Sequence, residues 1–142
     1  MRLLNSLQPF ALLLLRLSFA LIFIAHGYPG IAHRPNAMQA IFLQHGFPGY
    51  FAYVSGVLEL FGGGLLLLGL FTRGAALLLA LEMLFLMWRI YPPQSYFLVN
   101  EYQFPLVMVT GCFALAALGP GPFSLDYPLL ERTRAPRNSR NQ

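Results

Sequence analysis

The sequence predicts an all-α integral membrane protein, folded as a bundle of four transmembrane helices. Hydrophobic residues make up 57% of the 142 residues and charged residues only 10%, whereas soluble proteins carry about 25% charged residues. So few polar groups could not cover the surface of a soluble core. A chain of this length forms one domain, and it has room for about four spans of ~20 residues each.

Four apolar segments are long enough to cross a membrane, and we expect each to be a helix. They cover roughly residues 7–26, 51–70, 74–90 and 102–118. The connection between the first two segments is expected to be a loop. Together the four segments form one membrane domain, residues 1–131. The remaining segment, 132–142, is rich in arginine and polar enough to be disordered.

The first segment has some features of a signal peptide, because Arg2 precedes its apolar run. That run is longer than the roughly 7 to 15 residues of a signal-peptide core, and it carries Arg16 in its middle. We therefore expect the segment to be retained as a helix of the bundle.

The arginines predict the orientation, because the chain contains no lysine. With an even number of helices, both termini and the turn at 71–74 share one side of the membrane. That side holds Arg2, Arg73, Arg132, Arg134, Arg137 and Arg140, and the other holds Arg34 and Arg89. Positively charged loops stay in the cytoplasm, so we expect both termini there. Most of the net charge of +4 belongs to the tail, which favours contact with anionic lipid and not with nucleic acid.

Three ionisable residues, Arg16, Glu59 and Glu82, interrupt the apolar segments. A charge near the bilayer centre costs at least ~2.5 to 3.5 kcal/mol, so such groups are usually buried against a partner or a cavity. At ~1.5 Å per residue, Arg16 lies about 10 Å from the cytoplasmic end of its segment, Glu82 about 12 Å and Glu59 about 16 Å. We therefore predict that the Arg16 guanidinium contacts Glu82 and also Glu59, since its fork of donors suits carboxylates.

Two interpretations of this polar cluster remain open. The cluster could simply hold the bundle together, since helices gain little from the hydrophobic effect in lipid. Alternatively it handles protons or binds a polar ligand. Two acids and one arginine leave one carboxyl group without a partner, so that group must be protonated, reach Arg89 or hold a ligand.

Other chemistry is sparse, and no catalytic residue can be named. Cys112 is the single cysteine, which excludes an intrachain disulfide or a C-x-x-C redox centre. The spacing of His26, His33 and His45 matches no familiar zinc pattern, and we predict no metal site. Aromatic residues near the segment ends form an interfacial belt, or they line a quinone-sized pocket together with His26 and Tyr28.

Four sequence blocks resemble the DoxX family of small four-helix bacterial membrane proteins. They are Arg16 with His26–Gly27, GVLELFGGGLLLLGLFTRGAA at 56–76, NEYQFPLV at 100–107 and LGPGPFSLD at 118–126. The resemblance covers nearly the whole chain, and it implies a protein of the bacterial inner membrane. The residues that match motif positions are Arg16, His26, Glu59, Arg73 and Glu101, whereas Glu82 is selected by its depth alone.

The resemblance also implies two functions of different classes. The family is named from a subunit associated with thiosulfate:quinone oxidoreduction, and related members are linked to membrane oxidoreductases and to oxidative or thiol stress. The first hypothesis is therefore an accessory redox subunit that binds quinone or a small polar or sulfur species between its helices. The second is a non-catalytic scaffold or assembly factor for an oxidoreductase or stress-response complex.

Neither hypothesis makes the chain an autonomous enzyme, and neither requires a covalently bound cofactor. The expected partners are the lipid bilayer, an oxidoreductase and a second copy of the chain. A ligand or partner is expected to enter at an outer mouth, where the topology brings together the ends of the first and fourth segments. The residues of this mouth are His26, Tyr28, Glu101 and Tyr102.

Overall fold

The computed structural model describes residues 2–32, 35–90 and 103–128, and every regular element in these ranges is a helix. The helices are α1 (Arg2–Ala32), α2 (Pro35–Gln44), α3 (Tyr50–Leu68), α4 (Thr72–Arg89) and α5 (Gln103–Leu118). The all-α prediction is confirmed for these ranges. The predicted boundary at residues 131 and 132 and the predicted disordered tail lie outside the described residues.

The segment expected to be a loop between residues 27 and 50 is largely helical. Helix α1 continues through Pro29 to Ala32, and α2 follows. Helix α2 begins with a proline at its first position, where the missing N–H is harmless. Its apolar residues Met38, Ile41 and Phe42 recur at helical spacing and pack on the core. That spacing was a signal for α2 that the loop prediction overlooked.

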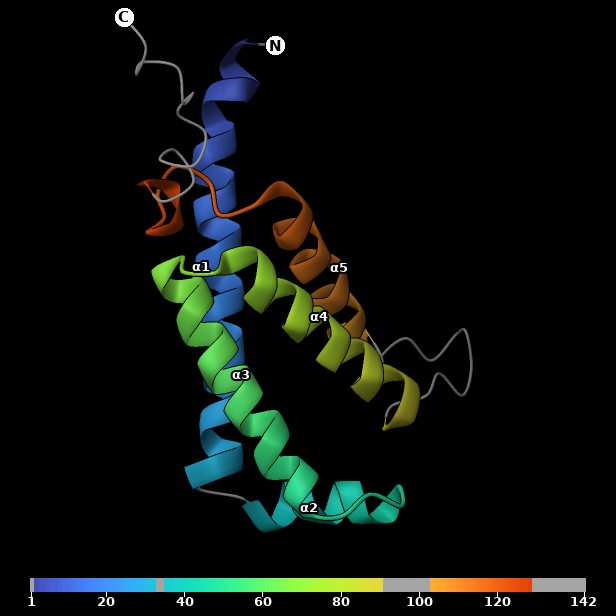
Figure 1. Cartoon of the computed structure of the whole chain (residues 1–142). Helices are drawn as coiled ribbons and strands as arrows, with labels where there is room; N and C mark the ends of the chain where they lie inside the picture. Colours follow the sequence, from blue (N-terminus) through green and yellow to red (C-terminus); the bar gives the residue numbers. More distant parts are fainter. Residues whose placement is uncertain (1, 33–34, 91–102, 129–142) are drawn as a thin grey trace, which may run out of the picture.

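The helices form two pairs that diverge from a common end. Helix α1 packs along α3 and α4 packs along α5, while α2 lies at the far end of α3 (Figure 1). Small residues allow α1 and α3 to approach closely, as membrane helices commonly do. A Cβ atom on Gly27 would lie 2.7 Å from the backbone oxygen of Gly56. The backbones of α1 and α3 are therefore in direct contact.

Two helices are long and apolar enough to cross a membrane. One is the stretch Leu7–Pro29 of α1, with a mean hydropathy of 2.1, and the other is Tyr50–Leu68, with a mean hydropathy of 1.7. Both are buried over less than half of their length inside the fold, and large side chains such as Leu14 and Phe61 are exposed. An apolar surface of this extent is compatible with lipid contact. Helix α5 is also apolar, but it is shorter.

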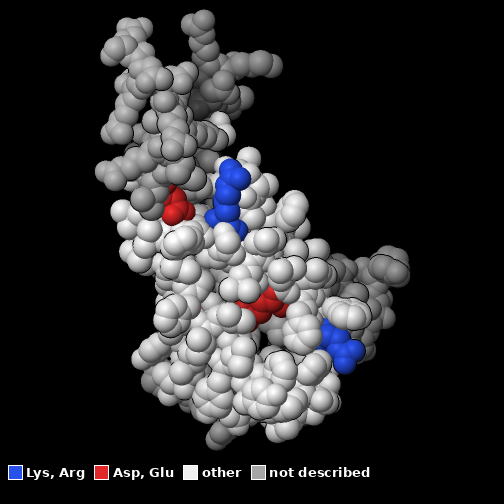
Figure 2. All heavy atoms as spheres, in the orientation of Figure 1, with Lys and Arg blue, Asp and Glu red and all other residues white. Residues whose placement is uncertain are grey.

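Charged side chains of the described residues occupy few places on the face that Figure 2 shows. Figure 2 shows one face of the molecule with isolated acidic and basic groups among uncharged atoms. The buried core lies between the helix pairs and is mainly aliphatic and aromatic, including Phe23, Leu66, Leu79 and Leu115. The buried polar residues Arg16 and Glu59 lie at two separate levels of the bundle.

Candidate functional site

Arg16 is buried at the common end of the helix pairs, where Nη1 and Nη2 of its guanidinium donate to backbone groups and Nε has no partner in the described ranges. Only 3% of the residue is exposed. Its Nη1 donates a hydrogen bond to the Pro120 carbonyl oxygen at 2.9 Å, and its Nη2 donates one to Phe123 O at 2.6 Å. The guanidinium therefore fastens the segment that follows α5 onto α1.

The prediction that Arg16 contacts Glu82 and Glu59 is wrong. A Cβ atom on Gly69 would lie 2.7 Å from Arg16 Nη1. Gly69 follows Glu59 by ten residues, which corresponds to ~15 Å of helical rise. The depth estimate failed because it started the first helix at residue 7. Helix α1 begins at Arg2 and extends past the α3–α4 turn (Figure 1), so helix ends do not mark a common depth.

Asp126 is a second fastening point at this end, and the sequence analysis missed it. Its Oδ1 and Oδ2 accept hydrogen bonds from the backbone N–H groups of Phe71 and Thr72, both at 2.8 Å. Its own N–H donates to Gly69 O at 2.9 Å. The carboxylate thereby caps the start of α4, where Phe71 has a left-handed φ of 47° and supplies no side-chain cap. An anion at a helix N-terminus is favourable.

We call residues 119–127, which carry these contacts, the tether. Arg16 and Asp126 also attract each other electrostatically. Arg73 lies against the tether, because a Cβ atom on Gly119 would come within 3.0 Å of its Nε. Phe71 has no polar side chain that could cap α4, so the N–H groups at the start of this helix need an acceptor from elsewhere in the chain. This is the one feature of the sequence that indicates a distant cap.

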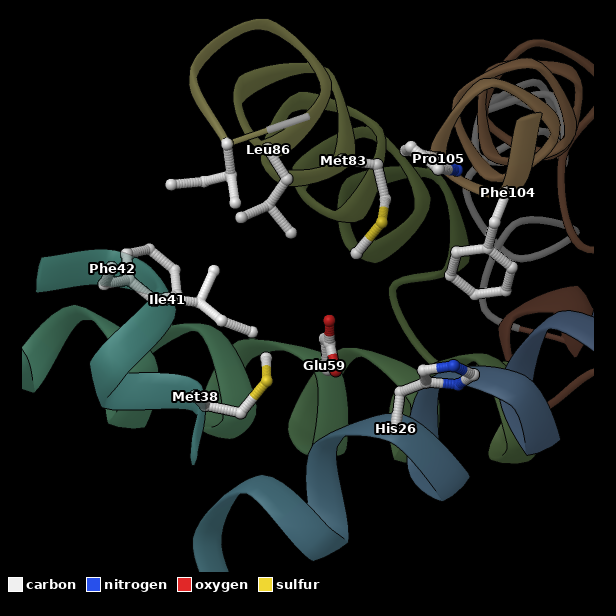
Figure 3. A pocket seen from close by; sticks show the side chains of 10 residues that line it. His26, Met38, Ile41, Phe42, Glu59, Met83, Leu86, Phe104 and Pro105 are labelled. Carbon is white, nitrogen blue, oxygen red and sulfur yellow. The ribbon is translucent and has the colours of Figure 1, made fainter. Parts of the chain in front are cut away.

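A cavity of about 240 Å³ lies at the other level of the bundle, between the two helix pairs and against α2. All five helices contribute to its wall. The lining residues are His26, Met38, Ile41, Phe42, Glu59, Met83, Leu86, Ile90, Phe104 and Pro105. Figure 3 shows the Glu59 carboxyl group projecting into this space, with His26 and Phe104 at one side. Among the described residues, the side chains of this wall are therefore apolar except for one carboxyl group and one imidazole.

The Glu59 side chain is buried without a hydrogen-bond partner. Only 7% of the residue is exposed, and it makes no hydrogen bond within the part of the chain that the structure describes. The nearby Ser55 hydroxyl donates to Glu82 Oε1 at 2.7 Å instead. An unpaired buried carboxyl group is costly unless a ligand or a proton compensates it.

The structure brings Glu82 close to Glu59 but leaves it outside the cavity wall. The two carboxyl groups interact electrostatically, and Glu82 Oε2 is buried without a partner in the described ranges. Arg89 does not neutralise either acid in this arrangement. Its guanidinium carbon lies 5.2 Å from the centre of the Phe47 ring and 5.7 Å from that of Trp88, a cation–π arrangement.

His26 lines the cavity in a defined orientation. Its Nδ1 lies 2.9 Å from the Ile22 carbonyl oxygen one helical turn earlier, and its ring stacks on Phe104 with centroids 4.7 Å apart. Of the other residues expected at the outer mouth, Tyr28 is exposed and does not line the cavity. Glu101 and Tyr102 lie outside the described residues.

Sequence reasoning missed the contribution of α2 to the cavity, namely Met38, Ile41 and Phe42, because that segment was expected to be a loop. Within the described ranges, no group of three or more His, Cys, Asp or Glu side chains could hold a metal ion. Cys112 is a free thiol and fully buried. The chemistry of the cavity therefore lies with Glu59 and His26.

Comparisons with known proteins support the resemblance drawn from the sequence. A family model described as DoxX matches residues 11–92, which is more than half of the chain. An uncharacterized protein of Haemophilus influenzae is 39% identical over 80 residues, covering 56% of this chain and 58% of that protein. The match thus spans less than two thirds of the relative's length. No solved structure matches the chain.

Proposed function

Since this chain belongs to the DoxX family of membrane proteins, we propose that it binds a quinone-type molecule in the cavity around Glu59 and serves a membrane oxidoreductase as an accessory subunit. The observation that carries the proposal is the Glu59 carboxyl group, which is buried, unpartnered and directed into the cavity. Burying this carboxyl group is unfavourable for the folded protein, and no described group of the chain compensates it with a hydrogen bond. A ligand that bonds to the carboxyl group would offset that cost.

The rest of the cavity wall suits a flat, mostly apolar ligand. Ligand sites are typically apolar with a few polar groups that fix orientation. Here Met83, Leu86 and Phe104 supply apolar surface, and Glu59 and His26 supply polarity on one part of the wall. A volume of about 240 Å³ accommodates one substituted six-membered ring. A long isoprenoid tail would have to extend beyond it.

The roles of the two polar residues follow from their positions. Glu59 would bond to a ring oxygen and exchange protons with it, assisted by the neighbouring carboxyl group of Glu82. His26 would bond to a second polar group of the ligand while Phe104 holds the imidazole in place. The electron-transfer chemistry would belong to the partner oxidoreductase.

Ligand binding by the purified full chain tests this proposal. We expect a short-chain benzoquinone/hydroquinone pair to bind in detergent micelles, measured by isothermal titration calorimetry. Glu59→Gln should weaken the affinity by roughly tenfold to a hundredfold, since a hydrogen bond to a charged group contributes about 1.5 to 3 kcal/mol. Phe61→Leu, on the exposed face of the same helix, is the matched control and should bind normally. Equal affinities for the two variants would contradict the proposal.

A scaffold function is the second candidate, and the tether favours it. Arg16 and Asp126 both make hydrogen bonds to backbone groups of distant segments of the chain, as expected for groups that hold a fixed shape for a partner. Filling the cavity with Met83→Trp separates the two functions. A scaffold would still assemble with its oxidoreductase and support normal activity, whereas a ligand-binding subunit would assemble without supporting activity.

For the membrane arrangement we propose four spans, α1, α3, α4 and α5, with both termini in the cytoplasm of the inner membrane. The start of α1, the α3–α4 turn and the end of α5 lie toward the same end of the fold (Figure 1), which supports an even number of crossings. On a Cys112→Ser background, Tyr28→Cys should react with an impermeant thiol reagent added outside, and Arg73→Cys should not. The reverse labelling pattern would invert the topology.

A further inference from the structure

The geometry points to the reduced form of the ligand: the cavity binds a hydroquinone in preference to the corresponding quinone, because the described residues of the cavity wall offer hydrogen-bond acceptors and no fixed donor. This inference rests on the proposed function, which assigns a quinone-type ligand without choosing its redox form. The choice follows from the hydrogen-bonding capacity of His26 and Glu59.

His26 is one of the residues that line the cavity, and its neutral ring has one acceptor nitrogen. A carbonyl oxygen can only accept, so the 2.9 Å contact with Ile22 O assigns the hydrogen of the neutral imidazole to Nδ1. The other ring nitrogen, Nε2, is then unprotonated and accepts hydrogen bonds. Stacking on Phe104 keeps the ring in the orientation that makes the Ile22 contact.

Glu59 adds acceptor oxygens to the same wall. No described group donates to its carboxyl group, and the hydroxyl of Ser55, one helical turn earlier, donates to Glu82. When ionised, a carboxylate can only accept, and when protonated it still retains acceptor capacity. The eight remaining residues of the wall have apolar side chains: Met38, Ile41, Phe42, Met83, Leu86, Ile90, Phe104 and Pro105.

The two redox forms of a quinone differ in what they can offer these acceptors. Quinone oxygens only accept, so a quinone would leave His26 Nε2 unpaired and would find a donor on Glu59 only when that group is protonated. Each hydroxyl of a hydroquinone can donate as well as accept, so it matches both residues in either state of Glu59. A site built around a ligand hydroxyl discriminates strongly against analogues that lack it.

A matched ligand series on the full-length protein tests the inference. The probes are 2,3,5-trimethylhydroquinone, its quinone and its dimethyl ether, titrated anaerobically in detergent micelles and followed by calorimetry. We expect the hydroquinone to bind at least ~tenfold more tightly than either of the others, which corresponds to about 1.4 kcal/mol. The ether has the same ring without donors, so it separates hydrogen bonding from burial of the ring.

Variants of His26 sharpen the test. His26→Leu should reduce the preference for the hydroquinone over the quinone to ~threefold or less, whereas His26→Gln, which keeps an acceptor oxygen, should retain part of it. Unchanged elution and thermal unfolding profiles would show that both variants are folded. The ligand series on the unaltered protein does not depend on these variants.

The outcomes distinguish this inference from the proposed function. Quinone binding as tight as that of the hydroquinone would overturn the inference and leave the proposed function intact. Equal binding of the ether and the hydroquinone would do the same, because burial alone would then explain the affinity. Absence of binding by all three molecules would overturn the proposed function, and the inference with it.

Discussion

The tether and the cavity hold buried polar groups at two levels of the same bundle. The two regions differ in whether these groups have hydrogen-bond partners within the protein. At the tether, Arg16 donates two hydrogen bonds to backbone carbonyl groups, although its Nε has no partner in the described ranges, and both carboxylate oxygens of Asp126 accept from backbone N–H groups. In the cavity, Glu59 has no partner within the described chain. Burial does not separate the two cases, since Arg16 is 3% exposed and Glu59 is 7% exposed. Whether a buried charged residue has a structural role is therefore indicated by the presence of a partner within the protein, and not by the degree of burial.

The comparison also explains how one sequence pattern can have two meanings. A charge in an apolar helix must be compensated, and the compensation can come from the protein itself or from something that the protein binds. Arg16 illustrates the first solution, because it joins α1 to a segment more than one hundred residues away. Glu59 is a candidate for the second. Substitutions should therefore affect the stability of one region and ligand binding in the other.

The largest loss of stability is expected for Arg16→Met. The substitution leaves the Pro120 and Phe123 carbonyl groups without donors and removes the charge opposite Asp126. A hydrogen bond from a charged donor contributes about 1.5 to 3 kcal/mol, and two are lost here, so the thermal unfolding midpoint in detergent and the membrane accumulation should fall sharply. Arg16→Lys should recover only part of the loss, because an ammonium group does not reproduce the guanidinium fork. If Arg16→Met were as stable as the wild type, Arg16 would have no structural role, and the proposed difference between tether and cavity would be wrong.

A smaller loss is expected for Gly27→Ala, which disturbs the cavity without changing a polar group. The new methyl group would meet backbone atoms of Gly56 and Leu60 at 2.7 and 2.8 Å, so α1 must move away from α3. Overpacking of this kind costs about 1 to 3 kcal/mol, and the movement would displace His26 relative to Glu59. Unfolding and ligand titration should both report the change.

Gly64→Ala is the matched control for Gly27→Ala. A Cβ atom at Gly64 meets nothing within 4 Å, and alanine favours the helix by roughly 0.8 to 1.0 kcal/mol over glycine. The control should therefore be as stable as the wild type or more so, with unchanged ligand affinity. Equal losses at both positions would show that close contact of α1 and α3 is not the cause.

Asp126→Ala tests the second fastening point of the tether. It removes the acceptors of the Phe71 and Thr72 N–H groups, and loss of a helix cap costs about 0.5 to 2 kcal/mol. Amide hydrogen exchange should accelerate at these two residues, whereas amides near Glu59 should keep their protection. Asp126→Asn retains one acceptor oxygen and should fall between Asp126→Ala and the wild type. Faster exchange throughout α3 would show that tether and cavity are not independent.

The sequence was sufficient to locate the apolar helices. The predicted segment 51–70 corresponds to Tyr50–Leu68, and 74–90 corresponds to Thr72–Arg89. Apolar runs and the left-handed Gly69 between them are local features that leave a clear pattern. Helix α2 was missed because it is short and has a proline on either side of its start, Pro29 within α1 and Pro35 at its own first position.

The sequence identified polar residues of the site but not how they combine. Glu59 and His26 were both selected, and they meet in one cavity. The pairing of Arg16 with the acids was wrong, because helical rise gives positions along one helix and not the offset between two helices. Asp126 could not be assigned a role, because the phenylalanine before α4 signals that a cap is needed but not which distant residue supplies it.

The smallest effect on stability is expected for Glu59→Gln, and it is the sharpest test of the comparison. The substitution breaks no hydrogen bond within the described chain and removes an acidic group near Glu82, so the free energy of unfolding should not fall by more than about 1 kcal/mol. The same variant should lose most of its ligand affinity. Arg16→Lys provides the opposite pattern, with reduced stability and retained affinity in the fraction that folds. If Glu59→Gln instead unfolded the protein while binding persisted in its folded fraction, Glu59 would belong with Arg16 as a structural residue.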